Sequence, residues 1–295
     1  MDVINEILQT VLRGISIGCI YGLVALGFVL IYKATEVINF AQGEVMMLGA
    51  FVGYTLIAVL GLPYWAALLL ATLALGLIGM ILERVVLRPL IGEPTFAIVM
   101  VTVGLGFFLR SVVTMIPGWG AESYGLKTPF MEKFLRYGQL VISWEHLAII
   151  LLTLALVFVL FCFFKFTRAG VAMRAASQNQ LAAVYMGISI NRVFSLIWII
   201  SAALGAFAGI LLAPVTFVHF NMGFLGLRAL PAAVLGGFGS IPGAVVGGLI
   251  IGLTESFAGF YLPVGWKDIA AYIILILVLI LRPEGLFGIQ QKKKV

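Results

Sequence analysis

The sequence is poor in charged residues. Only 10% of its 295 residues are Asp, Glu, Lys or Arg, while 63% are hydrophobic. A soluble domain of this length could not cover so large an apolar core with so few charges. Long apolar runs separated by short polar breaks favour transmembrane helices over a β-barrel, whose strands alternate over about 10 residues. The sequence therefore predicts an all-α polytopic membrane protein.

Residues that support metal, redox or acid–base chemistry are equally scarce. The chain has two cysteines, Cys19 and Cys162, and two widely separated histidines, His146 and His219. Both cysteines lie inside apolar runs, as is typical of free packing thiols. A membrane enzyme would need a cluster of His, Asp or Cys at one membrane surface, and the sequence has no G-x-x-x-x-G-K-[ST] phosphate-binding loop. We therefore predict no enzymatic activity, no metal and no cofactor held by this chain.

Apolar runs of about 20 residues mark the expected transmembrane helices. They cover residues 12–32, a run that ends near residue 60, and residues 64–82, 95–116, 145–166, 193–215 and 269–281. Between the last two, a long apolar stretch is interrupted at residues 236–242. The pattern predicts a single transmembrane domain over residues 1–295 with about eight to nine spans. Nine crossings result if both halves of the interrupted stretch cross the membrane, and seven if they form a re-entrant pair; we favour nine.

The interruption is rich in glycine, with Gly236, Gly237 and Gly239 followed by Pro242. Two half-helices joined at membrane depth would explain it, since unpaired backbone is tolerated there only against protein or a water-filled cavity. Such a break can serve as a gate beside a translocation pathway. A tight helix–helix contact also requires glycine, so both interpretations stay open.

Positive residues set the expected orientation, because cytoplasmic segments of membrane proteins carry an excess of Lys and Arg. They gather between the fifth and sixth spans and in the tail: Lys165, Arg168, Arg174, Arg192, Lys292, Lys293 and Lys294. Both segments, and with them the C-terminus, should be cytoplasmic, which places the N-terminus outside. The longest external loop then covers residues 117–144. Its aromatic residues fit a membrane interface: Trp119, Tyr124, Tyr137 and Trp144.

The cytoplasmic segment 168–192 has three arginines and no acidic residue. Its pattern predicts one short amphipathic helix over residues 171–186. One face carries Leu181, Val184, Tyr185 and Ile188, and another carries Arg174 and Gln178. Gly187 stands where a helix would end in the left-handed conformation that glycine adopts cheaply. Such a helix can dock into a groove of a partner or lie on lipid headgroups.

Polar residues run directly into the second span. Glu44 should face protein or water, since a carboxylate in lipid costs about 2.5–3.5 kcal/mol. Asn39, Gln42 and Glu44 either belong to a gate or pathway, or form a helix N-terminus with Asn39 or Gln42 as the cap and Glu44 favoured by the dipole. Thr102 and Gly104, in the fourth span, either line the same pathway or serve close packing.

Arg110 lies toward the end of the fourth span. It could pair with Glu44 or with Glu255, the other carboxylate within the apolar runs. A long side chain near the end of a span can also extend its charge to the membrane surface while its stem stays in the apolar region. We predict this second arrangement, at the outer interface.

Three stretches resemble one family. They are LIYKATEVINFAQGEVMMLGAF, the helix at residues 174–187, and AVLGGFGSIPGAVVGGLIIG. In this order they resemble the permease subunits of branched-chain amino acid ABC importers, and the likeness covers nearly the whole chain. INFAQGE is the most specific of these signals. The glycine-rich stretch also resembles sugar permeases and so indicates the superfamily rather than the substrate.

ABC importer permeases carry a cytoplasmic coupling helix with the motif E-A-A-x-x-x-G, which docks on the ATPase. Ala182, Ala183 and Gly187 match its spacing here, whereas Leu181 replaces the glutamate and Ile200 stands where a proline is usual. The resemblance therefore implies an ATPase-coupling role for this segment. The residues assigned to it are Arg174, Gln178, Ala182, Ala183 and Gly187. The alternative is an ordinary connecting helix on the headgroups.

The resemblance also implies the partners and the cargo. A related second permease would complete a heterodimer in the bacterial inner membrane, two cytoplasmic ATPases would bind and hydrolyse ATP, and an external solute-binding protein would deliver the cargo. Branched-chain or other hydrophobic amino acids are the expected substrates, with urea or short amides as the alternative. An ion-coupled secondary transporter is a further alternative, which would rely on intramembrane carboxylates such as Glu44 and Glu255.

Overall fold

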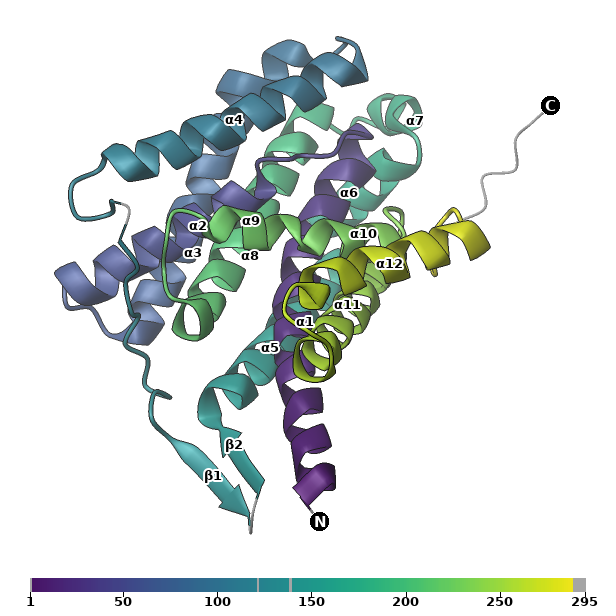
Figure 1. The fold of residues 1–295 in the computed structure, drawn as a ribbon. Helices are drawn as coiled ribbons and strands as arrows, with labels where there is room; N and C mark the ends of the chain where they lie inside the picture. Colours follow the sequence, from purple (N-terminus) through teal and green to yellow (C-terminus); the bar gives the residue numbers. More distant parts are fainter. Residues whose placement is uncertain (1, 121, 138–139, 289–295) are drawn as a thin grey trace.

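The computed structural model describes residues 2–120, 122–137 and 140–288. Lys292, Lys293 and Lys294 and the side chain of Tyr137 lie outside what it describes. The described chain is almost entirely helical (Figure 1). Its first half contains α1 (Asp2–Thr35), α2 (Gln42–Tyr54), η1 (Thr55–Val59), α3 (Tyr64–Leu82), η2 (Glu83–Leu87), η3 (Arg88–Leu90) and α4 (Thr95–Met115). A hairpin of β1 (Phe134–Tyr137) and β2 (Leu140–Ser143) precedes α5 (Trp144–Phe166).

The second half begins with two short helices, α6 (Arg168–Gln178) and α7 (Gln180–Tyr185). The long helix α8 (Ile190–Thr216) follows, then α9 (Met222–Leu227), α10 (Ala229–Gly236), α11 (Ile241–Tyr261) and α12 (Trp266–Leu281). The sequence-predicted spans agree with these helices to within a few residues, except that α1 is longer at both ends. The prediction of an all-α polytopic membrane protein is confirmed.

Seven helices of the described chain are long and apolar enough to cross a membrane: α1, α2 with η1, α3 with η2 and η3, α4, α5, α8 and α11. Two further apolar segments are shorter: Met222–Gly236, which contains α9 and α10, and α12. The predicted interruption at residues 236–242 is present, because α10 ends at Gly236 and α11 begins at Ile241. Seven helices of the described residues thus qualify as spans by length and composition, so the predicted eight to nine spans stay a prediction.

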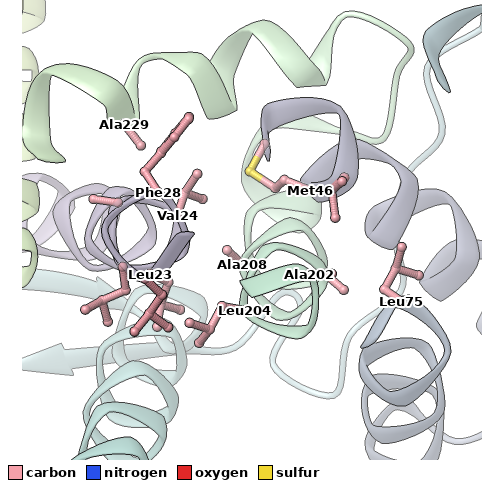
Figure 2. Close-up of a cluster of buried hydrophobic side chains, with 14 of the residues drawn as sticks. Leu23, Val24, Phe28, Met46, Leu75, Ala202, Leu204, Ala208 and Ala229 are labelled. Carbon is pink, nitrogen blue, oxygen red and sulfur yellow. The ribbon is translucent and has the colours of Figure 1, made fainter. Parts of the chain in front are cut away.

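Helices α1 and α8 form the centre of the bundle. Leu23, Val24 and Phe28 of α1 are fully buried, and Ala208 of α8 is among the side chains that surround them (Figure 2). Small residues allow the closest contacts, as is usual between membrane helices. A Cβ on Gly252 of α11, for example, would overlap the backbone of α1 at Gly18.

The two ends of the bundle carry different elements (Figure 1). The N-terminus and the β1–β2 hairpin lie at one end, and α6 and α7 lie at the other. The segment between α10 and α11 also reaches the second end, because the Phe238 ring packs against Tyr32 near the end of α1 at a centroid distance of 4.5 Å. We call these the hairpin end and the α6–α7 end.

Candidate functional site

The segment between α1 and α2 returns into the bundle instead of staying at its surface (Figure 1). Helix α1 ends where Glu36 adopts a left-handed conformation, at φ 57°. The chain is then extended through Asn39, and α2 begins at Gln42. Asn39, Gln42 and Glu44 expose only 1%, 1% and 4% of their surface. All three predicted site residues of this segment are therefore enclosed by protein.

Thr102 holds the extended segment against α4, and Asn39 supports the turn into α2. The Ala41 amide donates to Asn39 Oδ1 at 3.1 Å, and the Phe40 amide donates to Thr102 Oγ1 at 3.2 Å. Thr102 in turn donates to the Val99 carbonyl at 2.8 Å. Asn39 Nδ2, although buried, has no hydrogen-bond partner among the described residues. Thr102 thus accepts a hydrogen bond from the backbone amide of Phe40, which lies outside the helices and has no helical partner.

Gln42 connects α2 to the centre of the bundle. Its Nε2 donates to the Ser201 carbonyl at 3.0 Å, and Ser201 Oγ lies 3.0 Å from both Gln42 Oε1 and the Gly27 carbonyl. Gly27 must lack a side chain, because a Cβ there would overlap Gln42 Nε2. Ser201 went unnoticed in the sequence, where one serine inside an apolar run carries no distinctive signal.

Glu44 forms an ion pair with Arg110 of α4. The Arg110 guanidinium also lies over the Phe224 ring of α9, 3.7 Å from its centroid. A Cβ on Gly223 would overlap both oxygens of the Glu44 carboxylate, so glycine is required there. The prediction that Arg110 extends to the outer interface is wrong. An arginine within reach of a buried carboxylate gains more from the pair than from the membrane surface.

Neither Asn39 nor Gln42 caps α2. The N-cap position is Ala41, and no side chain accepts a hydrogen bond from the first turn. The cap interpretation of these two residues is therefore wrong in its geometry. Their polar groups are instead directed to the adjacent turn and to α8, while Glu44 does occupy the first turn as predicted.

The remaining pathway candidates lie apart from this cluster. Gly104 is exposed on α4, with nothing within 4 Å of a Cβ built there. Gly236 packs so closely on Gly243 that a Cβ on either would overlap the backbone of the other. Gly237 has a φ of 92°, while Gly239 has open space around it. The break is therefore a close helix contact, and a role of these glycines in gating stays a prediction.

The segment 168–192 differs from the single helix that the sequence predicts. It forms α6 and α7, separated at Asn179, whose φ of −157° and ψ of 105° are extended. Asn179 Oδ1 accepts a hydrogen bond from the Ala182 amide at 3.0 Å, so this residue starts a new helix as an N-cap. The apolar residues keep their helical spacing across the break, so the sequence pattern predicted one helix instead of two.

Gly187 ends α7 as predicted. Its φ is 80°, and the Ile188 amide donates to the Ala183 carbonyl at 2.9 Å, a pattern typical of glycine C-caps. Within the predicted coupling set, Arg174, Gln178 and Ala182 are exposed, whereas Ala183 is 4% exposed and faces the protein.

Four large apolar side chains of α7 and its C-terminal end face outward. We call them the α7 apolar face: Leu181 (72% exposed), Val184 (52%), Tyr185 (86%) and Met186 (82%). They lie at the α6–α7 end, where α7 follows α6, a helix that carries Arg168 and Arg174. Gln180 ties α7 to the bundle, since its Nε2 donates to the Ala34 carbonyl of α1 at 2.9 Å. The sequence pattern predicted three of these four, Leu181, Val184 and Tyr185, on one face of a helix that could dock into a partner or lie on lipid headgroups.

A second buried charge cluster lies near the α6–α7 end. Arg88 donates to Glu83 through Nε at 3.0 Å and Nη2 at 2.8 Å, and Ser195 Oγ donates to Glu83 Oε2 at 2.8 Å. Glu83 is 2% exposed. The ion pair joins η2, η3 and α8.

Comparisons with known proteins agree over the whole chain. Residues 10–279 match the family described as the branched-chain amino acid transport system permease component. The high-affinity branched-chain amino acid transport system permease protein BraD of Pseudomonas aeruginosa is 35% identical, with 100% of both chains covered. The corresponding protein LivH of Escherichia coli is 33% identical, over 98% of this chain and 97% of the relative.

A solved structure supports the fold at lower similarity. A chain of PsaBC from Streptococcus pneumoniae in complex with Fab superposes with a TM-score of 0.52 at 13% identity, covering 94% of this chain and 92% of that one. This likeness concerns the fold alone. Because the family match extends over residues 10–279 and the relatives align along their full length, the chain belongs to the family of branched-chain amino acid transport system permease components.

Proposed function

We propose that this chain is the membrane-spanning permease subunit of an ATP-driven ABC importer that carries branched-chain or other hydrophobic amino acids. The observation that carries the proposal is the full-length similarity, at 33–35% identity, to relatives named as high-affinity branched-chain amino acid permeases. Permeases for urea or short amides resemble this family too, so the transported compound is the first property to test.

The α7 apolar face supports a docking role for the α6–α7 end. Four exposed apolar side chains next to a basic helix are costly in water and favourable in a partner's groove. In the proposed complex, two cytoplasmic ATPases bind this face and hydrolyse ATP, while a related second permease completes the membrane unit. Arg174, Gln178 and Ala182 flank the contact; Ala183 and Gly187 shape the helix that presents it.

This assignment also sets the orientation. The α6–α7 end and the C-terminus are cytoplasmic, whereas the N-terminus and the loop 117–144 with its β1–β2 hairpin are external and receive the solute-binding protein. The separation of these elements to opposite ends of the bundle supports this orientation (Figure 1). An accessibility assay with single cysteines introduced in the hairpin and in α7 tests it.

The buried polar cluster supports a pathway or gate at the start of α2. Asn39, Gln42, Glu44 and Thr102 join three helices around an extended segment, so a movement of α2 would have to rearrange all of these bonds together. A secondary transporter would need a carboxylate free to load an ion. Glu44 is paired with Arg110, and Glu255 accepts a hydrogen bond from Tyr21 at 2.7 Å, which favours the ATP-driven alternative.

Uptake by the reconstituted system tests the function. The full-length chain is co-expressed with a candidate sister permease and ATPases, placed in proteoliposomes, and supplied with the solute-binding protein and radiolabelled leucine. We expect uptake that requires internal ATP, survives ionophores and is reduced by isoleucine and valine. Uptake of urea or acetamide instead of leucine would support the amide alternative, and uptake driven by an ion gradient without ATP would contradict the proposal.

A further inference from the structure

A cavity of about 600 Å³ lies at the α6–α7 end, between α1, α6 and the chain that follows α12. We call it the α6 cavity. Its volume lies within the roughly 300–1,000 Å³ of small-molecule sites. Charged residues from all three parts of the chain line it: Lys33 and Glu36 near the end of α1, Arg174 of α6, and Glu284 after α12. Lys33 is half-buried and the other three are exposed, so a ligand in the cavity can reach charges of both signs.

None of these four side chains forms an ion pair with another residue in the described part of the chain. The ion pairs present there are Arg88–Glu83, Arg110–Glu44 and Arg228–Asp268. The two cations of the cavity are also neighbours, because the positive charge of Arg174 acts on Lys33. Like charges repel more strongly where protein replaces water around them. An anion between Lys33 and Arg174 would remove this repulsion.

Two neutral side chains with hydrogen-bond donors belong to the same wall. Tyr32 of α1 and Gln178 of α6 line the cavity, and neither side chain has a hydrogen-bond partner among the residues that the structure describes. Phosphate oxygens accept hydrogen bonds from hydroxyl and amide groups and from cationic side chains. A phosphate alone would leave the carboxylates of Glu36 and Glu284 without a partner. A ligand that carries both a phosphate and an ammonium group matches the cations and the carboxylates together.

The position of the cavity gives it access to lipid. Lys33 lies near the end of the apolar helix α1, at the level where a transmembrane helix reaches the lipid headgroups. Ile280 and Leu281 in the last turn of α12 are 73% and 80% exposed. Pro283 and Glu284, which follow them in the sequence, are part of the cavity wall. A lipid with its acyl chains against this end of α12 can therefore place its headgroup in the cavity, as in other basic pockets between transmembrane helices.

We propose that the α6 cavity binds the headgroup of a phospholipid that carries a phosphate and a primary ammonium group. The phosphate lies between Lys33 and Arg174, and the ammonium group faces Glu36 and Glu284. The acyl chains extend along the exposed end of α12. A lipid bound here stabilises the present arrangement of α1, α6 and the chain after α12, because it binds charges from all three. The proposal uses the membrane location of the chain and no property of the transported compound.

Two double variants separate the two parts of the headgroup. Lys33→Gln with Arg174→Gln removes the cations that hold the phosphate, and we call it the cation variant. Glu36→Gln with Glu284→Gln removes the carboxylates that hold the ammonium group, and we call it the carboxylate variant. Arg192→Gln is the matched control, since Arg192 is an exposed arginine near the start of α8 that does not line the cavity.

Binding is measured by native mass spectrometry on the purified full-length chain in detergent. The chain is titrated with phosphatidylethanolamine, phosphatidylglycerol or phosphatidylcholine of identical acyl chains. Phosphatidylglycerol has the phosphate without an ammonium group, and phosphatidylcholine has methyl groups in place of the N–H donors. Soluble phosphoethanolamine, which is the headgroup without acyl chains, is added as a competitor to distinguish a lipid from a free phosphate ester.

We expect the wild type to bind phosphatidylethanolamine about tenfold more tightly than phosphatidylcholine, because only the former has N–H donors for the two carboxylates. The cation variant should bind phosphatidylethanolamine and phosphatidylglycerol about tenfold more weakly, since each basic residue adds to the attraction for phosphate. The carboxylate variant should lose affinity for phosphatidylethanolamine and not for phosphatidylglycerol. Arg192→Gln should change each affinity by less than about twofold.

Equal affinity of the wild type for phosphatidylethanolamine and phosphatidylcholine overturns the proposal, and so does wild-type affinity in the cation variant. Displacement of the lipid by an equal concentration of phosphoethanolamine would identify a soluble phosphate ester as the ligand and overturn the assignment to a lipid. If the cation variant is not monodisperse in size-exclusion chromatography, Arg174→Gln, at an exposed residue, decides in its place. Leucine uptake is a separate measurement, so the failure of either proposal leaves the other standing.

Discussion

Two regions of this molecule differ in whether residues of the same chain cover their side chains. The segment 36–44 brings polar groups into the bundle and pairs most of them with residues from α4 and α8. The α7 apolar face does the reverse, since it leaves large apolar side chains uncovered at the α6–α7 end. Apart from Asn39 Nδ2, the first region finds its partners within the described part of this chain. The second is uncovered in this chain, and we propose that another subunit supplies the missing contacts.

Breaking the Glu44–Arg110 pair should have the largest effect on stability. Arg110→Ala leaves a 4%-exposed carboxylate without its cation, which costs about 3–5 kcal/mol. We expect poor yield and a clearly lower thermal unfolding midpoint in detergent. The double variant Glu44→Gln, Arg110→Gln should recover most of the loss, because no uncompensated charge remains. An unchanged midpoint in Arg110→Ala would mean that the pair does not hold α2 to α4.

Removal of the Ser201 hydroxyl should have a smaller effect. Ser201→Ala deprives Gln42 Oε1 and the Gly27 carbonyl of a shared donor in the core, at a cost of about 1–3 kcal/mol. A moderate fall in the unfolding midpoint is expected, measured beside Ser111→Ala as the control. Ser111 is exposed, and its hydroxyl donates to the Phe107 carbonyl of its own helix at 2.9 Å. Equal midpoints for the two variants would contradict the role assigned to Ser201.

The cap between α6 and α7 should matter least for stability and more for communication with a partner. Asn179→Ala removes an N-cap worth about 1 kcal/mol and should shift the global unfolding midpoint little. We expect weaker stimulation of ATP hydrolysis by the loaded binding protein, because α7 is less well ordered. Asn179→Asp retains the acceptor and should behave like the wild type. The same loss of stimulation in both variants would exclude the cap as its cause.

Sequence reasoning correctly predicted features that depend on residues close together in the chain. Apolar runs set the spans, and the left-handed glycine Gly187 marked the end of α7. It failed where two distant residues decide the outcome. The partner of Arg110 depends on how α2 and α4 pack, and 66 residues separate Arg110 from Glu44. The role of Ser201 was missed for the same reason, because its partner Gln42 lies 159 residues away in the chain.

The break at Asn179 was missed for a local reason. A side-chain cap can end one helix and start the next while the spacing of apolar residues stays helical. A prediction based on that spacing alone therefore gives one continuous helix. The sequence also does not show which side chains are buried. Ala183 was therefore grouped with residues that face outward, although it is 4% exposed. The structure thereby moves the proposed contact from the small residues of the motif to the large apolar side chains beside them.

The most direct test of this account is recovery of the ATPases with a permease that carries Leu181→Ser and Tyr185→Ser. Both side chains are highly exposed, so folding and pairing with the sister permease should be unaffected. Val171→Ser, at an exposed valine of α6, is the matched control. We predict that the double variant loses the ATPases while the permease pair stays assembled and the control retains them. Normal recovery and normal ATP hydrolysis in the double variant would contradict the claim that a partner subunit covers the α7 apolar face.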